Sequence, residues 1–334
     1  MENKGPFNAM ITAIGHYVPD RVIDNKFYEE YLDTNDEWIK TRTGISERRR
    51  LDKDKPTSVM AIKAIEMLLK NRGIGIEDID LIIVGTVTPD MMYPSTACVI
   101  QKELGAKNAW GFDILAACSG FIFSLTTAMQ FVQSGSHKKV IVVGADKMSA
   151  ISNMEDRNTC ILFGDGAGAV LLEPTEDKDY GIIDSIMNID GEGGKYLYQL
   201  GGGSLNPASH ETVDQKMHYV YQDGKTVFKV AVKGMADVSY EIMEKNNLKP
   251  EQISYLVPHQ ANMRIITACA DRMGISMDKV MVNIHKYGNT TSGTIPLCIS
   301  EYWQEGKLKK GDYIILSSFG AGYTWGSILV RWGY

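Results

Sequence analysis

The second half of the sequence repeats, in the same order, motifs found in the first half. Residues 61–86 form a helical pattern, an NRG turn and the strand-like EDIDLIIVGT; residues 231–262 form a helical pattern, a KNNLKP turn and EQISYLVPHQAN. KNAWGFDILAACSG then matches MDKVMVNIHKYGNTTSG, and GDGAGAVLLEP matches FGAGYTWGSILVRW. An ordered match of this kind favours two copies of one unit over the self-similarity common to all α/β proteins. We predict an N-terminal half over 1–174 and a C-terminal half over 175–334.

Within the first half, short β-branched runs alternate with amphipathic stretches that end on glycine. This pattern is typical of α/β organisation, with βαβαβ-type units. The predicted strands cover 80–87, 109–116, 138–146 and 168–174, and the predicted helices cover 58–73, 95–105 and 119–135. The Gly-rich segment 188–207 is predicted to be a long loop, either a surface linker or a cover for a site.

Composition and charge exclude several classes of function. The net charge of −6 argues against a general nucleic-acid binder or a protein of anionic membranes. No apolar run approaches the length of a membrane span or resembles a secretory signal. The five cysteines include no CxxC and no metal-like spacing with histidine, so we expect free thiols, no metal and a cytoplasmic location.

One cysteine lies where a reactive thiol would be placed. Cys118, in DILAACSGFIFS, sits where a predicted strand passes into a predicted helix. The positive end of a helix dipole favours a thiolate there, although a packed core cysteine is the simpler alternative. A nucleophilic cysteine needs partners. His259 ends the strand SYLVPHQAN, His285 competes with it, and Asn289 lies in a Gly-Asn turn that matches the turn of Cys118 in the repeat.

The motifs ILAACSGF, VPHQAN, YGNTTSGTIP and SFGAGYTWGS, in this order and spacing, resemble those of β-ketoacyl-acyl-carrier-protein synthase III. The resemblance extends from YVPDRVIDN and TNDEWIKTRTGISERR through FGDGAGAVLL to WGSILVRWG. It implies a thiolase fold, with two duplicated halves in an α-β-α-β-α layered core. It also implies decarboxylative condensation of an acyl-CoA primer with malonyl-acyl carrier protein, which initiates fatty acid synthesis without a cofactor.

The same resemblance assigns roles to individual residues. Cys118 would carry the acyl group, and His259 and Asn289 would stabilise the charge that decarboxylation places on the malonyl thioester oxygen. The backbone N–H groups of Cys118 and Ala321 would form the oxyanion hole, with alanine where many relatives carry glycine. The adenine of CoA would lie between Trp38 and Arg157. The other predicted contacts to CoA and its pantetheine arm are Arg42, Thr43, Gly224, Phe228, Asn262 and Phe319.

Two further assignments concern protein partners. Tyr93 matches an aromatic residue that crosses a homodimer interface to floor the partner's acyl pocket, which suggests a short straight or branched primer. An acidic carrier protein needs a basic face. Lys225, Lys229 and Lys233 would form one stripe of a helix, and a solvated helix face is the alternative. Arg264 and Arg272 match docking positions, whereas Asp271 stands where relatives often carry a second basic residue.

Three alternatives remain beside this prediction. A thiolase would need a second cysteine in the C-terminal Gly-rich loop, where this chain has SFGAG. A related ketosynthase of secondary metabolism, of polyketide or quinolone type, would share the Cys-His-Asn set. A non-catalytic partner subunit would be expected to have lost Cys118.

Overall fold

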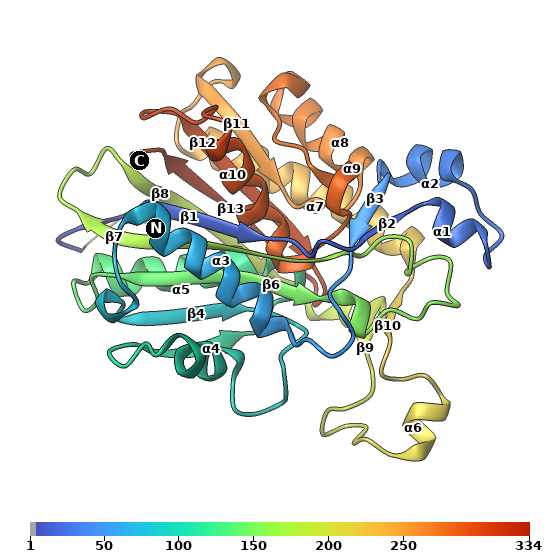
Figure 1. The fold of residues 1–334 in the computed structure, drawn as a ribbon. Coiled ribbons are helices and arrows are strands. Elements are labelled where there is room, and N and C mark those ends of the chain that lie inside the picture. The colour runs from blue at the N-terminus through green and yellow to red at the C-terminus, as the bar shows by residue number, and fades with distance from the viewer. Residues whose placement is uncertain (1–4) are drawn as a thin grey trace.

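Two mixed β-sheets form the framework of the protein, of which a computed structural model describes residues 5–334. The first sheet has the order β1-β7-β6-β4-β5, in which β4 is parallel to β5 and β6, and β7 is antiparallel to β1 and β6. Its strands are β1 (Asn8–Tyr17), β4 (Leu81–Gly85), β5 (Trp110–Ile114), β6 (Val140–Lys147) and β7 (Asp165–Thr175). Figure 1 shows this sheet in blue to green.

The second sheet is built from the later part of the chain. Its order is β11-β12-β13-β8; β11 is parallel to β12, and the remaining neighbours are antiparallel. The strands are β8 (Gly181–Ile189), β11 (Ile253–Pro258), β12 (Tyr313–Gly320) and β13 (Thr324–Arg331). The chain therefore changes sheets between Thr175 and Gly181. The division of the chain into domains at 174/175 itself stays a prediction.

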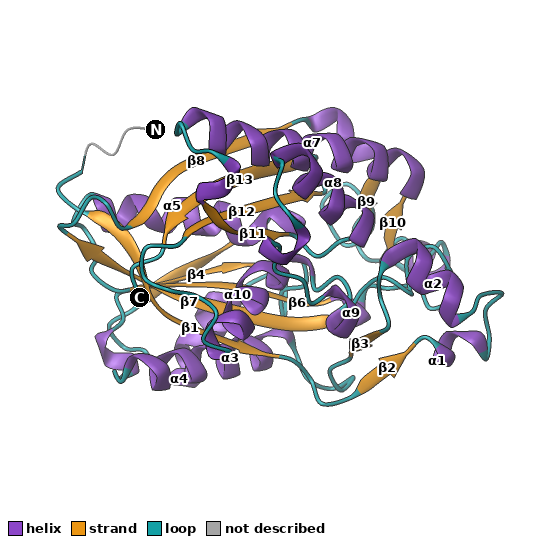
Figure 2. Cartoon of the chain, turned by 90° about the horizontal axis from the view of Figure 1, so that it is seen from above, coloured by secondary structure: helices purple, strands orange, loops and turns teal. Residues whose placement is uncertain are grey.

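Helices separate and cover the two sheets, which gives the five layers seen from above in Figure 2. The helices α5 (Gly120–Gln133) and α10 (Thr294–Gln304) share one apolar core with both sheets. The helices α3 (Thr57–Arg72) and α4 (Thr96–Leu104) cover the outer face of the first sheet, and α7 (Gly224–Lys245) and α8 (Met263–Met273) cover that of the second. The predicted α-β-α-β-α thiolase fold is confirmed.

Smaller elements surround this core. They are β2 (Val22–Asp24), α1 (Lys26–Glu29), α2 (Asp36–Thr43), β3 (Glu47–Arg49), α6 (His210–Asp214) and the hairpin of β9 (Leu197–Gln199) with β10 (Val220–Gln222). Figure 1 shows α6, in yellow, at the tip of a segment that projects from the body. The prediction of one long loop over 188–207 is wrong in part, because β9 lies within this segment and pairs with β10 beyond its end.

The predicted elements of the first half agree with the structure to within a few residues at each end. Local signals account for this agreement: α4, for example, begins after Ser95, whose hydroxyl accepts a hydrogen bond from the Cys98 N–H, and ends at Gly105 with φ of +69°. Between residues 5 and 334, no helix is long and apolar enough to cross a membrane. The same residues contain no cluster of three potential metal ligands from His, Cys, Asp and Glu.

The halves approach closely where β6 meets η7 (Thr291–Gly293). A Cβ added at Gly144 would lie 2.2 Å from the Ser292 carbonyl oxygen, a backbone atom that cannot move aside cheaply. We expect Gly144→Ala to destabilise the fold by about 1–3 kcal/mol, because an extra methyl group would have to force the two backbones apart. Thermal unfolding would measure this as a lower Tm. Gly203→Ala is the control, since its Cβ would meet nothing within 4 Å; equal Tm values for the two variants would contradict the account.

Candidate active site

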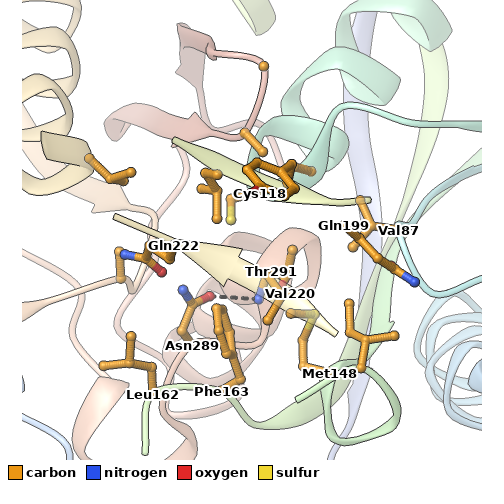
Figure 3. Close-up of a pocket in the computed structure, with 18 of the residues that line it drawn as sticks. Val87, Cys118, Met148, Leu162, Phe163, Gln199, Val220, Gln222, Asn289 and Thr291 are labelled. Atoms are coloured by element: carbon orange, nitrogen blue, oxygen red, sulfur yellow. Dashed lines mark hydrogen bonds between the residues drawn. The ribbon is translucent and has the colours of Figure 1, made fainter. Parts of the chain in front are cut away.

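The three residues predicted to form the catalytic set line one cavity of about 1670 Å³. Cys118 lies in η2 (Ala117–Ser119) between β5 and α5, His259 follows β11, and Asn289 precedes η7. Each of them lies at a turn: Cys118 follows β5 and His259 follows β11, which are edge strands of different sheets, so residues up to 171 positions apart in sequence share a cavity. Figure 3 shows Cys118 and Asn289 in the cavity wall with Met148, Phe163 and Val220.

The backbone around Cys118 forms a sharp turn. Ala117 has φ of +47°, a conformation that residues with a Cβ rarely adopt, and the strain marks a position fixed by its surroundings. The Ser318 hydroxyl donates a hydrogen bond of 2.8 Å to the Cys118 carbonyl oxygen. A Cβ at Gly320 would lie 2.7 Å from the Cys118 nitrogen, so glycine is required for this approach. The end of β12, followed by Ala321, therefore lies against the nucleophile.

The cavity does not favour a charged thiol. Burial raises the pKa of Cys118 to about 12, and the nearby Asp146 carboxylate contributes to the increase. Desolvation is the largest cause of this increase, and it acts against the thiolate that the helix N-terminus would favour. Burial thus favours the neutral form of Cys118.

His259 is 1% exposed and equally uncharged, since burial lowers its pKa to about 3. Its backbone N–H donates to the Ser317 carbonyl oxygen at 2.7 Å, and its ring Nδ1 lies 2.8 Å from the Thr294 hydroxyl oxygen. Nε2 has no hydrogen-bond partner among residues 5–334 and remains available to a substrate. The competing His285 is exposed, lies in α9 (Ile284–Tyr287) and is absent from the cavity lining.

Asn289 is fixed through both its backbone and its side chain. Its N–H donates to the Leu162 carbonyl oxygen at 2.9 Å, and its own carbonyl oxygen accepts from Gly164 N–H at 3.0 Å. The side-chain Oδ1 accepts a 2.9 Å hydrogen bond from the Thr291 N–H, drawn as the dashed line in Figure 3. Since Oδ1 is held in this way, the carboxamide presents its Nδ2 donor group to the cavity.

The side chains that were predicted to hold the adenine contact one another in the structure. The guanidinium carbons of Arg42 and Arg157 lie 5.6 and 4.9 Å from the centroid of the Trp38 ring. A purine between Trp38 and Arg157 needs about 7 Å, twice a van der Waals contact distance, so this gap is too narrow in the observed arrangement. Arg157 is instead hydrogen-bonded to the carbonyl oxygen of Asp33 and does not line the cavity, whereas Trp38 and Arg42 do.

The other predicted CoA contacts line the cavity: Thr43, Gly224, Phe228, Asn262 and Phe319. Asn262 connects α2 with α8. Its side-chain Nδ2 donates to the Arg42 carbonyl oxygen in α2 at 2.9 Å, and its Oδ1 caps the N-terminus of α8. The Thr43 hydroxyl is engaged with the Ile39 carbonyl oxygen within α2. Ala321 lines the cavity as well, and so does Tyr93, which is 86% exposed at its mouth.

The predicted docking residues differ in how free their charges are. Lys225, Lys229 and Lys233 are all exposed on α7. Arg264 is exposed, lines the cavity and holds its guanidinium carbon 4.3 Å from the centroid of the Phe228 ring. Arg272, by contrast, is paired with Asp237 at 3.0 Å, which offsets its charge.

Two polar residues of the site were not predicted from the sequence. Thr294 contacts His259, and nothing in the sequence indicates that contact, which joins segments 35 residues apart. Asp146 lies beneath the cavity with its carboxylate fully buried. Its position at the end of the apolar run VIVVGA was an available signal, since polar residues at strand ends commonly support sites in α/β folds.

The layered fold and the Cys-His-Asn cavity define a condensing enzyme of the thiolase-fold class. The family model described as 3-oxoacyl-[acyl-carrier-protein (ACP)] synthase III matches residues 112–191, and the model of its C-terminal part matches residues 243–332. The chain is 58% identical to the beta-ketoacyl-[acyl-carrier-protein] synthase III of Chlorobaculum tepidum, over 97% of this chain and 99% of the relative. The corresponding synthase of Koribacter versatilis is 55% identical over 98% of both chains.

Solved structures agree with these sequence matches. The 3-oxoacyl-[acyl-carrier-protein] synthase III of Aquifex aeolicus is 43% identical with a TM-score of 0.89, covering 97% of this chain and 100% of the other. The priming β-ketosynthase of the R1128 polyketide pathway is 32% identical with a TM-score of 0.91, covering 98% and 97%. The chain belongs to the β-ketoacyl-acyl-carrier-protein synthase III family.

The neutral state of Cys118 can be tested in the free protein. Because burial raises the thiol pKa to about 12, its alkylation by iodoacetamide should keep accelerating with pH through about pH 10, as the small thiolate fraction grows tenfold per unit. Peptide mass spectrometry would follow Cys118 separately from the exposed Cys98, which serves as an internal reference in the same sample. A rate for Cys118 that levels off below about pH 8 would instead indicate a stabilised thiolate.

Proposed function

We propose that this protein condenses an acyl-CoA primer with malonyl-acyl carrier protein, releasing CO₂ and forming a 3-oxoacyl-acyl carrier protein at the start of fatty acid synthesis. The observation that carries the proposal is the convergence of Cys118, His259 and Asn289 on one cavity. Relatives 52–58% identical over nearly the whole chain bear the name of this synthase. The 32% identity to the polyketide priming ketosynthase gives the secondary-metabolism alternative weaker support.

In the first half-reaction, Cys118 Sγ attacks the thioester carbonyl carbon of acyl-CoA. The Cys–acyl bond forms, the bond to the CoA sulfur breaks, and the thiol proton leaves with CoA as its free thiol. The developing oxyanion accepts hydrogen bonds from the backbone N–H groups of Cys118 and Ala321, which the close contact at Gly320 brings to the same part of the cavity. Because the thiolate is the attacking species, the thiol proton has to leave Cys118 Sγ as the new bond forms, and it is transferred to the departing CoA sulfur.

In the second half-reaction, malonyl-carrier loses CO₂, and the electron pair of the broken bond forms an enolate at the thioester. His259 Nε2–H and Asn289 Nδ2–H donate to the enolate oxygen. In this role the Thr294 hydroxyl turns its proton from the Thr291 carbonyl oxygen, 3.3 Å away, to His259 Nδ1, which keeps the ring proton on Nε2. The enolate carbon then attacks the acyl-Cys118 carbonyl, and Cys118 leaves as a thiolate that is reprotonated.

CoA delivery requires one rearrangement. Trp38 and Arg42 line the cavity entrance, with Thr43, Gly224, Phe228, Asn262 and Phe319 along its wall. For adenine to stack on Trp38, Arg157 has to release the Asp33 carbonyl oxygen and move outward. The cation–π contact between Arg157 and Trp38 is then replaced by an adenine ring that lies between the Trp38 indole and the Arg157 guanidinium.

The protein partners we infer are a second copy of the chain and an acyl carrier protein. Met91, Met92 and Tyr93 form an exposed apolar loop at the cavity mouth, which supports a homodimer with Tyr93 at the partner's acyl pocket. Lys229 and Arg264 offer uncompensated positive charge for an acidic carrier; Arg272 contributes less, because Asp237 is paired with it. The five free cysteines are consistent with a cytoplasmic location.

The first test uses the separate roles proposed for Cys118 in acyl loading and for His259 and Asn289 in decarboxylation. Acetyl-CoA should leave a covalent acetyl group on the Cys118 peptide of the wild type, of His259→Ala and of Asn289→Ala. Release of CO₂ from malonyl-carrier should fall by about 100-fold or more in both variants, since each loses one donor to the enolate oxygen. Mass spectrometry measures the loading, and labelled malonyl-carrier measures the CO₂.

Cys118→Ala is the control for loading, because it should show no adduct. An acetyl group found on another peptide would contradict the assignment of Cys118. Equal losses of loading and CO₂ release in the His259 and Asn289 variants would contradict the assigned roles of these two donors.

Carrier docking gives a second test. Arg264→Glu should raise the KM for malonyl-carrier about tenfold while leaving the KM for acyl-CoA nearly unchanged, because it reverses a free charge at the cavity mouth. Arg272→Glu is the matched comparison, and its effect should be smaller, since Asp237 already offsets the native charge. Steady-state kinetics at low salt would measure both; an unchanged carrier KM in Arg264→Glu would rule out this docking site.

A further inference from the structure

Asp146 is a fully buried carboxylate between the two halves of the protein, at the C-terminal end of β6. Its Oδ1 accepts three hydrogen bonds from the segment after β4: Thr86 Oγ1 at 3.1 Å, Val87 N at 2.8 Å and Thr88 Oγ1 at 3.0 Å. Thr86 and Val87 line the cavity. One oxygen of Asp146 therefore fixes a piece of the cavity wall in the first half.

The other carboxylate oxygen binds the second half. Oδ2 accepts a hydrogen bond from Ser292 N at 3.1 Å and lies 2.9 Å from Ser292 Oγ, whose single proton it shares with the Gly85 carbonyl oxygen at 2.6 Å. Ser292 is the middle residue of η7, three residues after Asn289 and two before Thr294. Asn289 is held through Thr291 N, and His259 contacts Thr294, so both proposed donors are attached to the turn that Asp146 anchors.

Stabilisation of the fold alone explains this arrangement poorly. Burial raises the pKa of the Asp146 carboxyl, and no Lys or Arg lies within ion-pair distance of it among the residues that the structure describes, so only hydrogen bonds favour its charged form. The carboxylate also opposes ionisation of Cys118. Its contribution to the site is therefore geometric: it spans from the wall beside the nucleophile to the turn of the two donors.

Asp165 provides an internal contrast. It is another fully buried aspartate, and it accepts hydrogen bonds from Leu51 N, Ser149 N and Ser149 Oγ. All of these donors belong to the first half, and none is attached to His259 or Asn289. The two aspartates are alike in burial and in charge-assisted hydrogen bonding, but only Asp146 connects the halves at the turn of the donors.

We propose that Asp146 is a positioning residue for the decarboxylation half-reaction, which holds the η7 turn so that Asn289 and the Thr294–His259 pair stay in register with acyl-Cys118. The inference rests on the proposed function. It does not give Asp146 contact with substrate. Loss of the bonds to Ser292 lets the turn shift, and an ångström of misplacement is enough to impair reacting groups.

Asp146→Asn tests the proposal with almost no change in side-chain volume. It replaces one carboxylate oxygen by an NH₂ group, which faces hydrogen-bond donors and cannot accept from them. We expect CO₂ release from malonyl-carrier to fall by about 10- to 100-fold while acetyl loading of Cys118 changes by less than about threefold. Asp165→Asn is the matched control, and any loss there should affect both half-reactions equally. Thermal unfolding of both variants separates lost stability from lost register.

Equal losses of loading and CO₂ release in Asp146→Asn, or the same ratio of the two as in Asp165→Asn, would overturn the proposal. If Asp146→Asn does not fold, Ser292→Ala is measured in its place. A loss of CO₂ release that exceeds the loss of acetyl loading by about threefold supports the proposal, and equal losses overturn it. Wild type and His259→Ala are measured alongside. If wild type loads no acetyl group on Cys118, or if His259→Ala retains CO₂ release, the proposed function has failed rather than the role of Asp146.

Discussion

The site depends on the close contact between the two halves of the protein. There the η2 turn of Cys118 meets the end of β12, and the η7 turn meets the end of β6. At Gly144 and Gly320 the backbones approach so closely that a Cβ would clash with the other half. Between these contacts, the Asp146 carboxylate and the Ser318 hydroxyl bridge the halves. The packing of one half against the other thus positions the reacting groups, and the rigidity of a buried interface fixes their geometry.

The same burial determines the electrostatics. Cys118 and His259 are both uncharged because the cavity removes them from water. An uncharged resting site suits the proposed thioester chemistry, in which new negative charge forms on a substrate oxygen in each half-reaction. The proposed donor groups of His259 and Asn289 are oriented by Thr294 and Thr291 before CO₂ leaves, so little reorganisation is needed. An uncharged resting state and preorganised donors are therefore two consequences of one buried interface.

The sequence predicted those features that depend on local patterns. Periodicity and glycine caps located the strands and helices, and strand-terminal turns singled out Cys118, His259 and Asn289. It could not predict contacts made across the halves, such as Thr294 with His259 or Asp146 with Ser292, because no local pattern records them. It could not predict the pKa of Cys118 either, since the helix dipole can be inferred from sequence but the depth of burial that raises this pKa cannot. The narrow gap between Trp38 and Arg157 is likewise a property of side-chain packing.

The central claim is that this cavity joins an acyl group from CoA to the malonyl unit of a carrier protein. Intact-protein mass spectrometry of the carrier, after incubation of the wild-type enzyme with acetyl-CoA and malonyl-carrier, tests it most directly. The account predicts a carrier whose malonyl group has been converted to a 3-oxobutanoyl group, with one CO₂ and one free CoA released per product. A carrier that stays malonylated, or that loses CO₂ without gaining the acetyl unit, would contradict it.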